Sequence, residues 1–245
     1  MTAGPVLILG GRSDIGLAVA HGFAAAGRDL QLAARDAASL APEAADLTLR
    51  YGVSVTLHEL DVLDTAGLET FVAGLDPCPE VAVCAIGVLG DQARAEEDTA
   101  EAVRVMRSNF EGPALALGLL AQRFARRGSG VIVGISSVAG DRGRATNYVY
   151  GAAKAGFTAF LSGLRNRLAR QGVHVLTVLP GFVQTRMTEG LDLPARLTAA
   201  PQEVASAILR AVARRRNVIY VRPVWRIVMA AIRAIPEPVF KRMRI

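Results

Sequence analysis

Cysteine and aromatic residues are scarce in this chain of 245 residues. The two cysteines, Cys78 and Cys84, have no metal-ligand spacing and cannot build a disulfide framework. We therefore expect a reducing compartment, the cytoplasm, and no metal site. Aromatic residues make up only 5% of the chain, and no nucleic-acid-binding motif accompanies them, so we expect no nucleic-acid partner.

Long apolar runs are also missing. No stretch approaches 18 uncharged apolar residues, so no membrane-spanning helix is predicted. The beginning, MTAGPVLILGG, lacks a basic segment and its apolar run is too short for a signal peptide. Acidic residues are in deficit, with 22 Asp and Glu against 28 Lys and Arg and a net charge of +6. This excess suits an anionic lipid or a phosphorylated substrate, and the inner face of the membrane is a compatible location.

What the chain does contain is a regular alternation of short apolar runs and longer helical patterns. This alternation predicts βαβ units and one doubly wound Rossmann-type parallel sheet with helices on both faces. Seven strands are expected, at 6–9, 29–34, 53–60, 80–86, 130–136, 173–179 and 217–221. Helices are expected at 15–26, 37–50, 65–74, 97–127, 148–170 and 201–215. We expect residues 1–221 to form the catalytic domain and residues 222–245 a basic amphipathic extension of it.

A glycine-rich segment, GGRSDIG at 10–16, follows the first predicted strand. Gly10 permits a tight turn, and Gly16 lets the next helix pack closely on the sheet. The backbone N–H groups at the helix start, around Ser13 and Ile15, would then face an anion such as a pyrophosphate. The alternative to a pyrophosphate site is an ordinary turn and helix cap. The position of the segment at the head of a βαβ unit disfavours this alternative.

The end of the second predicted strand bears on the choice of dinucleotide. Arg35 stands where an acidic residue would bind the ribose of NAD. An arginine can hold a 2′-phosphate instead, and Arg12 could add a second cation, which favours NADP(H) with NAD(H) as the alternative. We interpret Asp36 as the cap of the next helix. Asp61, after the third strand, suits either an adenine contact or a turn cap.

The segment YVYGAAK at 148–154 holds two tyrosines and a lysine. Tyr150 and Lys154 are four residues apart and share one face of a helix, whereas Tyr148 points elsewhere. Tyr150 is therefore the candidate proton donor. The fifth strand ends in ISS at 135–137, so either Ser136 or Ser137 could reach the same edge of the sheet.

Asn109 lies inside the long helical region at 97–127, where its helix propensity is unfavourable. An unfavourable residue at such a position indicates a task for its side chain.

Taken in order, the glycine-rich loop, Asn109, ISSVAG, YGAAK and PGFVQT at 180–185 resemble the short-chain dehydrogenase/reductase family over nearly the whole chain. The resemblance implies a catalytic tetrad of Asn109, Ser137, Tyr150 and Lys154. It also implies contacts to the nicotinamide from a second set of residues, namely Thr185, the Val183 backbone and the Pro180–Gly181 pair.

The chemistry implied by the resemblance is hydride transfer between a nicotinamide and a carbonyl. Tyr150 would supply the proton, and Lys154 together with the positive nicotinamide would lower the tyrosine pKa. Lys154 would also reach the ribose, and Ser137 would polarise the carbonyl. Asn109 would support a water-linked proton path from Lys154.

Two departures from the family pattern concern the dinucleotide. Leu9 and Asp14 stand where the family has threonine and glycine, and CAIG at 84–87 keeps only Gly87 of the usual NNAG. We expect Asp14 to cap the helix and the adenosine to be held differently.

A narrower resemblance is to the decaprenylphosphoryl-2-keto-ribose reductases, which reduce a keto-sugar on a polyprenyl phosphate. GGRSDIGLA, GVLGD, NYVYGAAKAG, PGFVQTRM and the tail RIVMAAIRAIPEPVFKRM carry it. That branch is associated with NADH, whereas Arg35 favours NADP(H). The competing substrates are a small ketone or a 3-ketoacyl thioester, and the competing function is an idle dinucleotide sensor or scaffold.

The tail from Arg222 to Ile245 mixes six basic residues with apolar ones and has a single acid, Glu237. Its basic residues are Arg222, Arg226, Arg233, Lys241, Arg242 and Arg244. A basic amphipathic segment can contact an anionic lipid surface, or it can pack as an ordinary helix or dimer contact. We expect a short lid between Thr185 and Pro201, and a homodimer or homotetramer built on the two longest helices.

Overall fold

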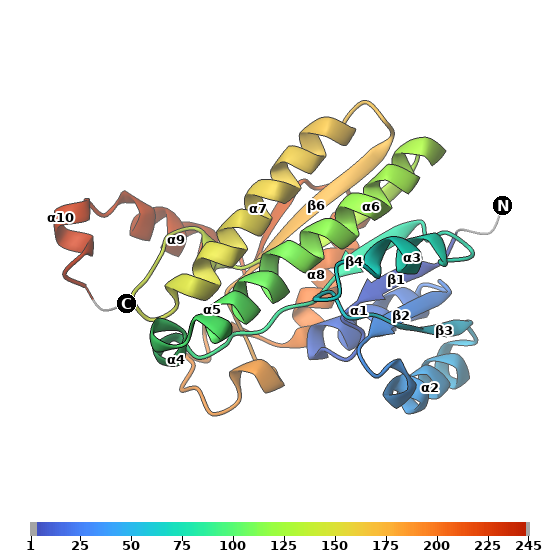
Figure 1. Cartoon of the computed structure of the whole chain (residues 1–245), viewed down its shortest axis with the longest axis horizontal. Coiled ribbons are helices and arrows are strands. Elements are labelled where there is room, and N and C mark those ends of the chain that lie inside the picture. The colour runs from blue at the N-terminus through green and yellow to red at the C-terminus, as the bar shows by residue number, and fades with distance from the viewer. Residues whose placement is uncertain (1–3, 244–245) are drawn as a thin grey trace.

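Seven parallel strands form the main sheet within residues 4–243, the part of the chain that the computed structural model describes (Figure 1). Each central strand is a short apolar run that is buried from both faces, as a parallel sheet between helices requires. In spatial order the strands are β3 (Val55–Glu59), β2 (Leu30–Ala34), β1 (Val6–Leu9), β4 (Val81–Cys84), β5 (Gly130–Ile135), β6 (Val173–Pro180) and β9 (Val218–Val221). The predicted fold class is confirmed, and each predicted strand lies within two residues of its observed bounds.

Helices cover both faces of this sheet and bury a separate apolar core on each. One face carries α1 (Asp14–Ala25), α2 (Ala41–Tyr51) and α8 (Pro201–Ala213). The other carries α3 (Leu68–Ala73), α6 (Gly112–Arg127) and α7 (Tyr148–Leu168). Figure 1 shows α6 and α7 side by side across the sheet.

The region 97–127, predicted as one helix, is broken into several. It holds the end of α4 (Gln92–Glu97), then α5 (Thr99–Met106), the π-helical turn η2 (Arg107–Glu111) and α6. Asp98 starts α5, because its carboxylate accepts a hydrogen bond from Ala100 N at 2.9 Å. The π turn contains Asn109, and such turns often mark functional positions.

All loops that follow the strands leave at one edge because the strands are parallel. The glycine-rich loop follows β1, and η1 (Ala37–Leu40) follows β2. The turn η3 (Val138–Gly140) follows β5. A small two-stranded sheet, β7 (Phe182–Val183) with β8 (Thr198–Ala199), and the turn η4 (Arg186–Thr188) follow β6.

The tail forms α9 (Val224–Ala234) and α10 (Glu237–Phe240), which extend away from the sheet at the left of Figure 1. The inner face of α9 packs on the protein's own core through Trp225 and Met229, which contact the cluster of Val138 and Leu179. Arg244 of the predicted tail lies outside the described residues. None of the helices in the described range is long and apolar enough to cross a bilayer.

Candidate active site

Tyr150 and Lys154 lie one turn apart at the start of α7, facing the end of β5. The Lys154 ammonium lies 5.8 Å from the centroid of the Tyr150 ring and donates a hydrogen bond to the Ile135 carbonyl at 3.1 Å. Only 4% of Lys154 is exposed. Tyr148, by contrast, is exposed, so of the two tyrosines it is Tyr150 that lies beside Lys154.

The two serines after β5 point to different places. The Ser137 side chain hydrogen-bonds Tyr150 and accepts from Ala139 N at 3.1 Å. Ser136 Oγ is directed instead into α7, where it donates to the Lys154 carbonyl at 2.9 Å and lies 2.7 Å from Thr158 Oγ1. Ser137 is therefore the serine beside Tyr150, and Ser136 fastens α7 to β5.

Asn109 is fully buried behind Lys154, and its side chain is completely engaged. Its amide nitrogen donates to the carbonyls of Val88 (2.7 Å) and Val105 (2.8 Å), and its Oδ1 accepts from Val88 N. A Cβ on Gly87 would lie 2.7 Å from Asn109 Oδ1 and 3.2 Å from Lys154 Nζ. This close approach explains why a glycine stands here. Both amide hydrogens of Asn109 are already donated, so the predicted water path stays a prediction that would use the side-chain oxygen or backbone atoms.

Burial sets the pKa values of the two central groups. It raises the pKa of Tyr150, and the hydrogen bond from Ser137 opposes this only in part. Burial also lowers the pKa of Lys154 to about 8. Lys154 is not among the groups that shift the Tyr150 pKa in this structure, because its ammonium donates to Ile135 rather than to the phenol oxygen. The lowering expected from Lys154 together with a positive nicotinamide concerns the protein with its dinucleotide bound and stays a prediction. A protonated tyrosine at neutral pH suits proton donation.

Replacing Lys154 by Met should stabilise the protein at pH 7 while removing activity. The folded-state pKa of about 8 lies below the ordinary lysine value of 10.5, so the buried ammonium destabilises the fold by about 3 kcal/mol at about 1.4 kcal/mol per pKa unit. This penalty is complete below pH 8 and disappears as the pH rises towards 10.5. Urea unfolding of the wild type and of Lys154→Met at pH 7 and at pH 10 measures this penalty. If the variant gained the same free energy of unfolding at both pH values, the charge of Lys154 would not be its cause.

The glycine-rich loop turns at Gly10, whose φ of +89° is a left-handed conformation that favours glycine. Ser13 caps α1 by accepting from Gly16 N at 3.0 Å. The backbone N–H groups of Asp14 and Ile15 have no hydrogen-bond partner among the described residues. Two free N–H groups at a helix start are suited to an anion.

The prediction that Asp14 caps this helix is wrong. Its carboxylate instead accepts from the backbone N (2.7 Å) and the Nε (2.9 Å) of Arg186, in the turn after β7. Arg186 also donates to the Arg12 carbonyl. These hydrogen bonds hold the segment after Thr185 against the glycine-rich loop. The positive charge of Arg186 also offsets the negative charge of Asp14, which stands where the family has a glycine. Sequence reasoning missed Arg186, whose partner lies 172 residues away.

At the end of β2 the guanidinium groups of Arg12 and Arg35 are exposed, and Arg12 donates to the Arg35 carbonyl at 3.3 Å. Asp36 does not cap η1 with its side chain, which lies 3.7 Å from the Arg12 guanidinium. Its left-handed backbone (φ 53°) is held by Glu59, whose carboxylate accepts from the N–H groups of Asp36 and Ala37 at 2.8 Å each. Glu59 reaches these N–H groups because it is paired with Ala34 in the parallel ladder of β2 and β3, and that pairing is what could have predicted the contact.

Two further predicted contacts have local partners. Asp61 is exposed and accepts from Leu63 N at 2.9 Å, so it forms the turn that was one of its two expected roles. Val183 lies in β7, and its carbonyl accepts from Thr188 Oγ1 at 2.7 Å. Thr185 starts η4, with its backbone N donating to the same hydroxyl. A hollow of about 1010 Å³ separates this segment from the outer side of α1.

Gly181 follows Pro180, the last residue of β6, and lies directly against Trp225 of the tail. A Cβ at this position would lie 1.9 Å from Trp225 Cε2. The indole is buried, donates to the Leu197 carbonyl at 3.0 Å and meets the Phe182 ring edge-on at 5.2 Å. The glycine therefore admits an indole, a role that is separate from the nicotinamide contact that the family resemblance implies for the Pro180–Gly181 pair.

Arg142, between η3 and α7, joins the tail to the catalytic region. One guanidinium nitrogen donates to the carbonyls of Ile232 (2.6 Å) and Ile235 (2.7 Å), and the other contacts Glu237 Oε2 at 2.9 Å. The guanidinium carbon also lies 3.5 Å from the centroid of the Phe240 ring. No local pattern pointed to this clamp, because its partners are about 90 residues away.

The histidines and acids offer no other chemistry at this edge. No group of three or more His, Cys, Asp or Glu within residues 4–243 could hold a metal ion. Each histidine has a local hydrogen-bond partner, namely Tyr51 for His21, Thr56 for His58 and the Arg216 carbonyl for His174.

Comparison with known proteins identifies the same pattern. Residues 5–194 match the family model of the short chain dehydrogenases. An uncharacterized oxidoreductase of Mycobacterium tuberculosis is 43% identical over 244 residues, which cover 98% of this chain and 97% of that protein.

Two solved structures share the fold over nearly their whole length. A short-chain dehydrogenase from Sphingobium yanoikuyae in complex with NADPH has a TM-score of 0.81 and 27% identity, covering 98% of this chain and 96% of that one. A bulky-bulky ketone specific alcohol dehydrogenase from Comamonas testosteroni has a TM-score of 0.80 and 26% identity, covering 100% and 96%.

Proposed function

The chain belongs to the short-chain dehydrogenase family of oxidoreductases, and on that premise we propose that it reduces the ketone of a lipid-linked sugar, with Tyr150 as the proton donor. The observation that carries the proposal is the meeting of Ser137, Tyr150 and Lys154 beside the glycine-rich loop. Each member of the set is present, which favours an active reductase over an idle dinucleotide-binding scaffold.

A nicotinamide dinucleotide fits the residues at this edge. The free N–H groups of Asp14 and Ile15 suit a pyrophosphate, and Arg186 neutralises the nearby acid. When bound, the dinucleotide supplies the hydride. We propose that Thr185, Val183 and Pro180 line its nicotinamide end, that Gly87 and Asp61 border its adenosine side, and that it is NADP(H), held by Arg35 and Arg12.

The chain's own groups handle the carbonyl oxygen. Ser137 donates a hydrogen bond to that oxygen and holds it beside Tyr150. Tyr150, kept protonated by burial, gives its proton to the oxygen as negative charge develops there. Lys154 stabilises the phenolate that remains, and Asn109 holds the loop at Gly87 against Lys154. The raised pKa of Tyr150 favours the reductive direction at neutral pH.

Replacing Arg35 by Ala should weaken NADPH binding by about 10- to 100-fold, since a charge-assisted contact to a phosphate is worth about 1.5–3 kcal/mol. The NADH affinity should change little, because NADH has no 2′-phosphate. Fluorescence titration of both dinucleotides on the wild type and the variant measures this. Arg50→Ala is the control, since Arg50 pairs with Asp46 on the surface of α2. Equal affinities of the wild type for the two dinucleotides would overturn the NADP(H) assignment.

The tail and the lid support a large apolar substrate. Val138, next to Ser137, contacts the apolar cluster of Trp225 and Met229, which places tail side chains near the reacting groups. In the lid, Met187 and Leu191 are exposed, and Leu191 lines the hollow beside α1. Apolar side chains around an open site suit a polyprenyl chain better than a small polar ketone, and the outer side of α9 could rest on the membrane that carries this lipid.

A substrate panel tests this choice. A 2-keto-pentose on a polyprenyl phosphate should be reduced with a kcat/KM at least about tenfold above that of the same sugar phosphate without the chain, because the chain adds apolar burial. The panel also includes a bulky ketone and a 3-ketoacyl thioester, and reduced-nicotinamide absorbance follows each reaction. Faster turnover of either of these would replace the lipid-linked sugar as the substrate.

We also propose a homodimer through the outer side of α5, η2 and α6. The exposed apolar side chains there are Val103, Met106, Phe110 and Leu115. Apolar side chains gathered on one surface are typical of a subunit contact.

A further inference from the structure

A groove lies between α8 and the edge strand β9, on the face of the sheet opposite α6 and α7. Its volume is about 620 Å³, and its walls include Arg210 from α8, Arg214 directly after its last residue, Arg216 from the following turn and Tyr220 from β9. None of these residues belongs to the proposed active site. Arg210 and Arg214 are four residues apart, about one helical turn, and both line the same hollow.

The arginines of this groove differ in whether they have partners. Arg222, at the end near α9, pairs with Glu203 at 2.9 Å and donates to the carbonyls of Ala195 and Arg196, so its role is to hold the structure. Arg210, Arg214 and Arg216 are exposed, and their guanidinium groups make no hydrogen bond or ion pair with any residue that the structure describes. Three unpaired guanidinium groups around one hollow are suited to a phosphate.

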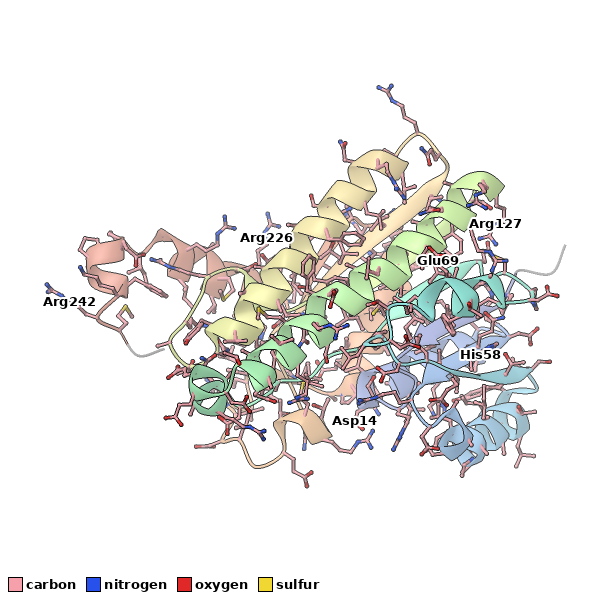
Figure 2. All side chains as sticks on the ribbon, in the orientation of Figure 1. Asp14, His58, Glu69, Arg127, Arg226 and Arg242 are labelled. Atoms are coloured by element: carbon pink, nitrogen blue, oxygen red, sulfur yellow. The ribbon has the colours of Figure 1, made fainter. Side chains whose placement is uncertain are left out.

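The groove is continuous with the outward side of α9. Arg222 and Pro223 line the groove, and α9 begins at the next residue. Beside them Val224 is 40% exposed and Ile227 is 72% exposed, although both are apolar. Arg226 is exposed between them, and Figure 2 labels it together with Arg242 near the end of the tail. Apolar side chains among cations are the pattern of a helix at a lipid surface.

Other occupants fit less well. A second copy of the chain docked here about a twofold axis would bring Arg210, Arg214 and Arg216 of both copies together, which like-charge repulsion opposes. A soluble phosphate compound would use the arginines but leave Ile227 in water. An anionic phospholipid satisfies both, because it offers a phosphate to the groove and an apolar region to α9.

We propose that the groove between α8 and β9 binds the phosphate of an anionic phospholipid, while Val224 and Ile227 enter the adjoining apolar layer. This attachment is separate from the active site and does not depend on which carbonyl compound is reduced. It would place the carboxyl-terminal helices against the membrane surface.

The test is co-sedimentation of the full chain with vesicles of phosphatidylglycerol and phosphatidylcholine, and with vesicles of phosphatidylcholine alone. Wild type should bind the anionic vesicles, with weaker binding at high salt. The variant with Arg210, Arg214 and Arg216 all changed to Gln should bind about 100-fold more weakly, since each arginine near an anionic surface contributes about fivefold. The dinucleotide affinity should stay unchanged and reports that the variant is folded.

Two further variants separate charge from position. The matched control changes Arg126, Arg167 and Arg170 to Gln, which are exposed on α6 and at the end of α7, and it should retain binding. Ile227→Ser keeps every charge and should still weaken binding severalfold. If the triple variant and the control lost vesicle binding equally, the groove would not be the lipid-binding site. Tight binding of glycerol 3-phosphate without preference for vesicles would overturn the lipid as its ligand.

Discussion

Replacing Tyr150 by Phe is expected to lower kcat/KM for carbonyl reduction by a factor of about 10³ or more, because a positioned general acid contributes about 10²–10⁴. The change removes one oxygen and keeps the ring that lies 5.8 Å from the Lys154 ammonium. Dinucleotide binding should therefore stay within about twofold of the wild type. Steady-state kinetics and a dinucleotide titration on the same preparations measure the two effects separately.

Tyr148→Phe is the matched control for this prediction. It removes the same atom from the same helix, two residues earlier, where the side chain is exposed. Activity close to that of the wild type is expected for Tyr148→Phe. If the Tyr150 variant kept more than about a tenth of the activity while the Tyr148 variant lost it, the proton donor would have been assigned to the wrong residue.

Replacing Gly181 by Ala is expected to destabilise the protein by about 3–5 kcal/mol, similar to the loss of a buried large aromatic side chain. The new Cβ would stand 1.9 Å from Trp225 Cε2, and the indole is enclosed by Phe182 and its hydrogen bond to Leu197. The tail must then move. Trp225 is the only tryptophan in the sequence, so its fluorescence should shift to the red and reports the displacement directly, beside urea unfolding.

Two variants make this result specific. Gly163→Ala, in α7, has nothing within 4 Å of the added Cβ and should be neutral or slightly stabilising. The double variant Gly181→Ala/Trp225→Leu should lose less free energy of unfolding than the sum of the losses of the two single variants, because the smaller leucine no longer conflicts with the new Cβ. A variant at Gly181 with unchanged fluorescence and stability but a weakened dinucleotide would mean that the glycine serves the nicotinamide instead.

The sheet could be predicted from the sequence because buried parallel strands are continuous apolar runs with glycine or polar residues at their ends. The Tyr150–Lys154 pair followed from helical spacing alone. Asp14 shows where such reasoning stops: its neighbours suggested a cap, and its actual partner Arg186 is 172 residues away. The π turn at Asn109 depends on the packing of α6 and α7, which local propensity does not describe.

The tail could be recognised as amphipathic, but its docking could not. The packing of Trp225 on Gly181 requires the three-dimensional neighbourhood of β6, and composition alone left lipid, partner subunit and own core as open alternatives. The structure places the inner face of the tail on the core and leaves its outer face exposed, so contact of the outer face with lipid or with a second subunit stays a prediction. A pattern of period 3.6 reports that a helix has two faces, but not what each of them contacts.

The clamp of Arg142 on the tail has a consequence for how the protein is made. The four groups of the proposed tetrad end at Lys154, so a ribosome completes them long before it reaches Glu237 and Phe240. Until those residues arrive, Arg142 has no partner and the apolar surface around Val138 and Leu179 is uncovered. A prematurely terminated chain would therefore expose apolar surface beside its reacting groups. Chaperones and proteases recognise exposed apolar surface of this kind. The segment that carries Glu237 and Phe240 thus distinguishes molecules with a covered core from fragments that stop before it.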